Sequence, residues 1–145
     1  MFQNRDEIRK VYLTVWQKLQ KGQILEPMES VIADIIQLHS EYHTFLQQGE
    51  SVQHTEFNPE SGNSNPFLHM GMHIALREQT STDRPSGIKK IHQKLAKKKG
   101  LHEAEHAMIE CLGQALWLAQ RDKTMPDDNA YLSRLKKLSL YFSLE

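Results

Sequence analysis

The sequence predicts an all-α protein, a compact antiparallel helical bundle of five to six helices that forms a single domain over residues 1–145. Three observations lead to this prediction. Apolar residues recur at intervals of three and four along most of the chain, which is the spacing of one face of a helix. Glycine, proline and capping residues interrupt these segments at short intervals, as helix ends do. No segment shows the apolar–polar alternation of a half-buried strand.

The composition fits a folded domain and argues against several classes of partner. The chain has 145 residues, of which 39% are hydrophobic and 25% charged, as is typical of a globular protein. Lys plus Arg and Asp plus Glu each number 18, so the formal net charge is zero. A neutral chain has no general attraction to nucleic acid or to anionic membranes. We therefore expect neither of them as a partner.

Three features predict a cytoplasmic protein. The single cysteine, Cys111, cannot form an internal disulfide, which fits a reducing compartment. The N-terminal residues lack the apolar core of a signal peptide. No run approaches the ~20 apolar residues that a membrane-spanning helix needs.

The first helix is expected over residues 5–20. Asn4 and Glu7 have the spacing of a capping box, and Gly22 is a natural stop. The expected buried face consists of Ile8, Tyr12, Val15, Trp16 and Leu19.

The second helix is expected to begin at Pro27, a favoured first-turn residue. It should break near His39, after which Ser40 starts a short helix through Leu46. Residues 48–65 follow, rich in Gly, Ser, Asn and Pro without periodicity, and predict a long loop. The expected buried face of the second helix consists of Met28, Val31, Ile32, Ile35 and Ile36.

A third helix is expected over residues 67–79, after Asn65 and Pro66. Apolar residues surround most of its axis, which favours a central position in the bundle. Such a helix allows a homodimer but does not require one. The apolar residues are Phe67, Leu68, Met70, Met72, Ile74, Ala75 and Leu76.

Three further helices complete the prediction. The first follows a loop at residues 80–87, with Ser86 as its cap, and ends at Gly100. The next covers residues 101–121, before Pro126, and the last covers residues 129–142. Their expected core residues are Ile88, Ile91, Leu95, Met108, Ile109, Leu112, Ala115, Leu116, Ala119, Tyr131, Leu135 and Leu138.

Histidine carries the main chemical signal. Eight histidines occur in 145 residues, a number that would give about 0.4 pairs at a spacing of four by chance. Three such pairs are present, on three different predicted helices. This spacing puts two imidazoles on one helix face, one turn apart. The pairs are His39 with His43, His69 with His73, and His102 with His106.

These pairs predict a transition-metal site inside the bundle. Two imidazoles one turn apart can hold one ion, and bundle metal sites are built from facing helices. Nearby carboxylates can act as ligands or orient a ligating histidine. The ion can be zinc, iron, manganese, nickel or copper, and no glycine-rich loop suggests a nucleotide. The candidate ligands are His39, His43, His69, His73, His102, His106, Glu105 and Glu110.

Two alternatives stay open. The histidines can be structural, in a non-catalytic interaction or regulatory bundle. Residues 102–106 also satisfy H-E-x-x-H, the pattern of zinc-dependent hydrolases, but Glu105 adds a charge between the histidines, and no Glu or His follows Glu110 before Glu145. Glu103 and His106 form one Glu-x-x-His motif, of which di-iron bundles need two. Catalytic residues and enzyme activity therefore stay undecided.

The remaining reactive side chains fit a simpler interpretation. His54 and His92 are expected to be exposed to solvent. Cys111 can be a soft ligand or a nucleophile, although a lone helical cysteine is more often a small core residue. The lysines of residues 89–99 form a basic helix face that solvation explains.

Residues 58–60 and 65–79, with residues 102–112 and 117–121, resemble a bacterial family catalogued as domain of unknown function 1841. The resemblance extends from the first helix to Leu138. It implies a single compact domain and carries no established activity. Glu103 varies in that family, which weakens the protease interpretation. The resemblance implies that the recurring positions of the family correspond in this sequence to His39, His43, His69, His73, Glu105, His106 and Glu110.

Overall fold

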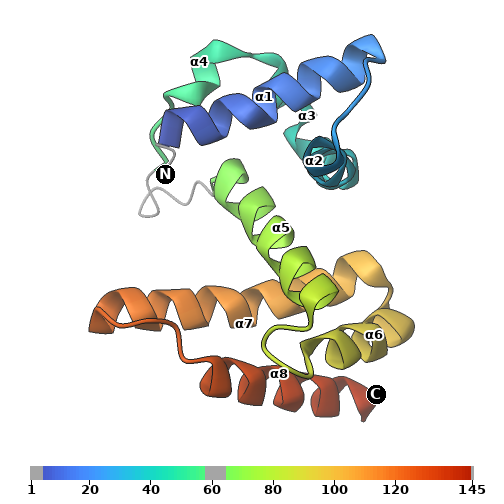
Figure 1. Ribbon diagram of the computed structural model, residues 1–145, viewed down its shortest axis with the longest axis vertical. Coiled ribbons are helices and arrows are strands. Elements are labelled where there is room, and N and C mark those ends of the chain that lie inside the picture. Colours follow the sequence, from blue (N-terminus) through green and yellow to red (C-terminus); the bar gives the residue numbers. More distant parts are fainter. Residues whose placement is uncertain (1–4, 58–64, 145) are drawn as a thin grey trace. The chain divides into compact units, whose positions relative to one another are not determined.

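The computed structural model describes residues 5–57 and 65–144, and this part of the chain is all-helical (Figure 1). The all-α prediction is confirmed, but the predicted number of five to six helices is wrong, because the described residues form eight α-helices and one 3-10 helix. In chain order they are α1 Arg5–Lys21, α2 Pro27–Leu38, η1 Ser40–Tyr42, α3 His43–Gln47, α4 Glu50–Gln53, α5 Pro66–Thr82, α6 Ile88–Lys99, α7 Leu101–Asp122 and α8 Asp128–Ser143.

The chain forms two compact units, Met1–Ile74 and Ala75–Glu145. The boundary falls inside α5, so one helix contributes its first half to one unit and its second half to the other. The prediction of a single domain stays a prediction. None of the described helices has the length and apolar character needed to cross a membrane.

The first unit is built around α1, which packs against α2 and α4. Local signals explain its helix ends. Gly22 follows α1 with a positive φ of 64°, a conformation that glycine adopts without steric cost. Glu26 and Glu29 form a reciprocal capping box at the start of α2, with Pro27 in its first turn, so two backbone N–H groups of that end are satisfied. Asn4 of the predicted capping box lies outside the described residues.

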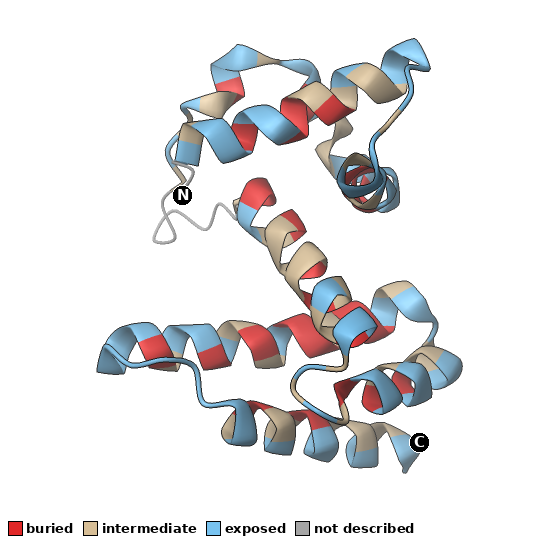
Figure 2. Ribbon diagram, viewed as in Figure 1, coloured by how far each residue is buried: buried red, intermediate tan, exposed pale blue. Residues whose placement is uncertain are grey.

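The core of the first unit lies between these helices, where Figure 2 shows buried positions on α1, α2 and α5. It is predominantly apolar and continuous. Its buried members are Tyr12, Leu13, Val15, Ile32, Ala33, Ile35, Ile36, Leu46, Val52, Phe67 and Met70.

One cation lies in that core. Arg9 of α1 is only 3% exposed, and its Nη1 donates hydrogen bonds to the carbonyl oxygens of Gln53 at 3.0 Å and Thr55 at 2.7 Å. The guanidinium also lies over the rings of Phe57 and Phe67, 5.5 and 5.0 Å from their centroids. These contacts compensate for the loss of water and tie α1 to the segment that follows α4.

The second unit contains α6, α7 and α8, which pack against one another in pairs. The helices α7 and α8 run antiparallel (Figure 1). The hydroxyl of Tyr131 donates a hydrogen bond of 2.7 Å to the side chain of Gln79 in the second half of α5. The fully buried side chains of this unit include Leu76, Ile88, Leu95, Met108 and Leu135.

Several local predictions are wrong. The predicted loop at residues 48–65 contains α4, and its residues 58–64 lie outside the described part. Ser86 is not the cap of α6, because Asp83 Oδ1 accepts hydrogen bonds from the backbone N–H groups of Gly87 and Lys89 instead. Four residues expected in the core are exposed, namely Ile8, Met28, Leu68 and Leu116.

Candidate metal centre

Three of the predicted ligands come together within the first unit. His39 directly follows α2, and His69 and His73 lie on consecutive turns of α5. Each offers one ring nitrogen, and these nitrogens lie within 4.8 Å of one another. His39 and His73 are fully buried, and His69 is half-buried. We call these three residues the histidine triad.

His39 is oriented by the end of α2. Its backbone leaves the helical conformation, with φ of −116° and ψ of 65°. The ring Nδ1 lies 2.8 Å from the carbonyl oxygen of Ile35. Because a carbonyl only accepts, Nδ1 must carry the proton, and the Nε2 of the neutral ring then has a lone pair. A metal-bound histidine is commonly oriented in this way.

Tyr42 fixes the plane of the His39 ring. The two rings stack with centroids 5.4 Å apart and an interplanar angle of 8°. Burial raises the pKa of Tyr42, with a further contribution from Glu41, so its hydroxyl stays protonated at neutral pH. Tyr42 therefore packs beside the triad as an uncharged aromatic side chain. Sequence patterns gave no signal for this role.

His69 and His73 obey the helical spacing rule. Their Nε2 atoms lie 3.3 Å apart. An ion held tetrahedrally by nitrogens at about 2.0–2.1 Å separates its ligand atoms by about 3.3 Å. The same distance suits an N–H···N hydrogen bond between neutral rings. The His39 ring meets both edge-on, with centroids 5.0 Å from His69 and 4.6 Å from His73.

His43 lies outside the triad. The expectation that it shares a helix face with His39 is wrong, because the helix breaks between them and α3 begins at His43. Its Nε2 donates a 2.8 Å hydrogen bond to the carbonyl oxygen of Ile36. Its ring packs on Trp16 with centroids 4.7 Å apart. His43 thus stabilises the turn after α2.

Glu105 of α7 is buried in the second unit, with 1% of its side chain exposed. Its Oε1 lies 3.6 Å from Arg77 Nε, and its Oε2 accepts a hydrogen bond of 3.2 Å from His92 Nε2. The carboxylate therefore contacts Arg77 and His92 within its own unit. The expectation that His92 is exposed is wrong, because only 16% of its side chain is accessible. The position of His92 next to Ile91, which is buried, was the available sequence signal that His92 is not fully exposed.

The other predicted ligands also belong to the second unit. His102 and His106 lie one turn apart on α7 with ring centroids 4.1 Å apart, as the spacing predicts. Glu110 is exposed. His54, in the first unit, is exposed as expected, and its Nδ1 lies 3.2 Å from Asp6 Oδ2.

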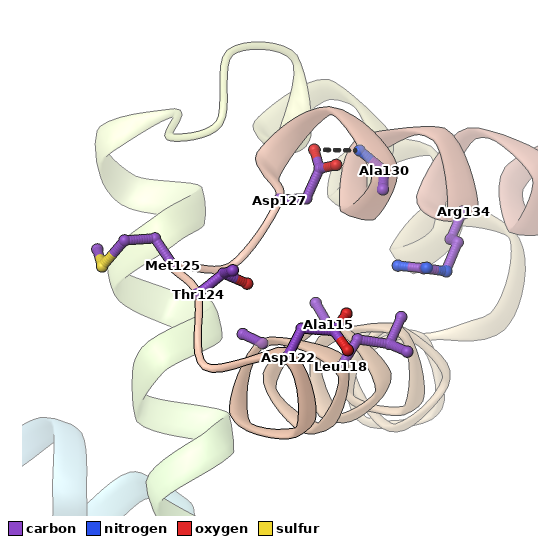
Figure 3. Close-up of a pocket in the computed structure, with 9 residues that line it drawn as sticks. Ala115, Leu118, Asp122, Thr124, Met125, Asp127, Ala130 and Arg134 are labelled. Atoms are coloured by element: carbon purple, nitrogen blue, oxygen red, sulfur yellow. Dashed lines mark hydrogen bonds between the residues drawn. The ribbon is translucent and has the colours of Figure 1, made fainter.

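Two other features have less metal-binding character. Burial, followed by the charge of Glu110, raises the pKa of the Cys111 thiol, which disfavours the thiolate that binds metals. A cavity of about 220 Å³ lies at the turn between α7 and α8 (Figure 3). Asp122 and Asp127 line it together with Arg134, so it offers no histidine nitrogen.

Fold and site together define an all-helical protein with a buried histidine triad. The sequence matches the family model described as Domain of unknown function (DUF1841) over residues 4–137, and the chain belongs to this family. The matched region covers most of both compact units. No curated protein and no solved structure matches the chain.

Proposed function

We propose that this protein binds one transition-metal ion through His39, His69 and His73. The observation that carries the proposal is the convergence of three ring nitrogens within 4.8 Å inside one unit. The tautomer of His39 supports it, since the proton on Nδ1 leaves Nε2 as a ligand. Burial supports it as well, because water competes weakly for an ion in a buried site.

The number of ligands decides what the ion does. Four protein ligands close a tetrahedral site, and such sites are structural, whereas three leave a position for water or substrate. A metal-dependent hydrolase requires the open position. The all-nitrogen donor set suits zinc, copper, nickel or iron better than magnesium or calcium.

The first experiment measures metal in the untagged protein, purified without chelators, by plasma mass spectrometry. The wild-type chain should carry a stoichiometric transition metal. His39→Gln and His73→Gln should lose it, because glutamine retains polarity and approximate size but not the imidazole lone pair. The matched control is His54→Gln, which removes an exposed histidine paired with Asp6 and should retain the metal. His43→Gln should also retain it.

A second measurement keeps the proposal testable if a triad variant unfolds. Wild-type protein stripped of metal is titrated with Zn²⁺ or Co²⁺ while its thermal unfolding is followed. An ion that binds only the folded state, at 100 times its Kd, adds about 2.7 kcal/mol of stability. Visible absorption of bound Co²⁺ reports tetrahedral coordination. If the protein binds none of the ions and its unfolding temperature does not change, the histidines have a structural role instead.

His106→Ala tests the prediction from the sequence that His106 is also a ligand, which would close the site. If His106 is a ligand, the variant binds Co²⁺ more weakly and its visible spectrum changes. If affinity and spectrum are unchanged, the three-histidine site is open, and hydrolytic assays with the wild-type protein then become the next test.

A further inference from the structure

Positive charge is concentrated on one helix of this neutral chain. Six of the 12 residues of α6 are lysine, and none is acidic. The neighbouring α8 adds Lys136 and Lys137. Lys90, Lys94 and Lys136 have no ion-pair partner among the described residues. Their charges are therefore available to an external anion.

A groove runs between α6 and α8 along this basic surface. It consists of two adjoining hollows of about 430 and 180 Å³. Lys94 and Ser139 line both hollows, so the two are adjacent. Leu140, which is 67% exposed, contributes apolar surface to the first, and Phe142 contributes to the second. Ile91 and Leu95 also line the first and the second hollow but are buried. Lys90, Lys94 and Lys136 border the first hollow.

We propose that this α6–α8 groove binds an acidic amphipathic helix of a partner protein. Ile91 and Leu95, which line the first and the second hollow, are four residues apart on α6, an axial rise of about 6 Å. A partner helix with apolar residues at positions i and i+4 has the same spacing and can place one in each hollow. Glutamate or aspartate beside them would meet the lysines of the rim, which complements their charge.

The chemistry of the groove favours this occupant over nucleic acid. Single strands bind through aromatic platforms on which bases stack. Phe142 is the aromatic residue that lines these hollows, and Lys99 Nζ already lies 5.0 Å from its ring centroid. The apolar surface around Ile91 and Leu140 suits aliphatic side chains. The cavity in Figure 3 is lined by two aspartates and offers no comparable attraction to an acidic segment.

The test uses a fluorescently labelled helical peptide of about 15 residues, long enough to form a helix. It carries leucines at i and i+4 and glutamates around them, and fluorescence anisotropy measures its binding to the full chain. The control peptide has the same composition, with the two leucines on opposite faces. Wild-type protein should bind the first peptide at least about tenfold more tightly than the second, which corresponds to about 1.4 kcal/mol.

Charge-reversal variants locate the site. Lys90→Glu with Lys94→Glu should weaken binding at least about tenfold, because two attractions become repulsions. Lys10→Glu with Lys21→Glu makes the same change in charge on exposed residues of α1 and should leave binding nearly unchanged. Circular dichroism checks that both variants are folded.

Four results would overturn the proposal. Equal binding of the two peptides would do so, and so would equal losses of affinity in the two double variants, because either outcome reduces the effect to net charge. Binding of a single-stranded oligonucleotide without binding of the leucine–glutamate peptide would assign the surface to nucleic acid. Peptide binding that Leu140→Glu leaves intact would place the contact outside the groove.

Discussion

The Nε2 atoms of His69 and His73 lie 3.3 Å apart on consecutive turns of α5. This spacing fits two arrangements of the same rings, a hydrogen bond between them or a shared metal ion. Replacement of the hydrogen bond by a shared ion requires that the proton between the two nitrogens is lost. It requires little movement of the backbone. A helix that already holds both rings at this distance lowers the entropy cost of binding. The triad is therefore largely preorganised for an ion.

Replacement of Arg9 by leucine should destabilise the protein by about 2–4 kcal/mol, because the carbonyl oxygens of Gln53 and Thr55 lose a charged donor. Arg9→Lys should cost less, since it retains the charge but only one donor group. Urea denaturation measures both changes. The control is Arg121→Leu, which alters an exposed arginine paired with Asp122. Equal losses for Arg9→Leu and Arg121→Leu would contradict a role for the buried guanidinium.

The two glutamates of α7 that were candidate ligands should differ sharply when replaced by alanine. Glu105→Ala should lower the free energy of unfolding by about 2–4 kcal/mol, because Arg77 and His92 lose their buried partner. Glu110→Ala should change it by less than about 0.5 kcal/mol, since Glu110 is exposed. Chemical denaturation compares them. Similar effects would show that the contacts of Glu105 contribute nothing to stability.

Gly71→Ala should stabilise the protein by about 0.5–1 kcal/mol, because alanine is the better helix former. A Cβ at this position would lie 3.6 Å from the hydroxyl oxygen of Tyr12, an ordinary contact. Gly22→Ala is the matched contrast. Gly22 has a φ of +64°, so alanine there should cost about 1 kcal/mol. Thermal unfolding measures the two changes in stability, which should have opposite signs. Destabilisation by Gly71→Ala would contradict the prediction and indicate crowding beside Tyr12.

Glu29 should make stability depend on pH in the acid range. Hydrogen bonds from the Glu26 backbone N–H and from Lys18 lower its pKa below the usual 4.5. Because the folded-state pKa is the lower one, the stabilisation is present above pH 4.5 and is lost as the pH falls through the folded-state pKa.

Glu29→Gln should therefore be less stable than wild type at neutral pH, and the gap should shrink on acidification. Urea denaturation across this range measures the gap. Glu78→Gln, at an exposed position, serves as the control and should show no such change. A gap for Glu29→Gln that is independent of pH would assign its effect to packing.

Most helices could be predicted from the sequence because their signals are local. Pro27 and Gly22 mark ends that the structure confirms, and the break near His39 is also observed. Burial was harder to predict. Arg9 lies in the core because carbonyl groups 44 and 46 residues away satisfy it. No periodicity within α1 can reveal partners at that separation.

The candidate site shows the same division between local and distant information. The spacing rule holds for His69 and His73, which share one helix. It fails for His39 and His43, because the rule assumes an unbroken helix and the chain turns at His39. The approach of His39 to the α5 pair depends on tertiary packing, which spacing cannot supply. The prediction that His92 is exposed is wrong because its lysine neighbours indicate a solvated face, and the sequence cannot show its contact with Glu105.

The division of α5 between the two units restricts how the chain can be dissected. A cut after Ile74 would divide its 17 residues into pieces shorter than the ~12–15 residues at which isolated helices begin to be stable. Fragments made at that boundary would fray next to His73. A truncated protein that fails to bind a ligand would then show that the helix is damaged. It would not show where the binding site lies. Point substitutions in the intact chain are the appropriate tool for mapping this protein.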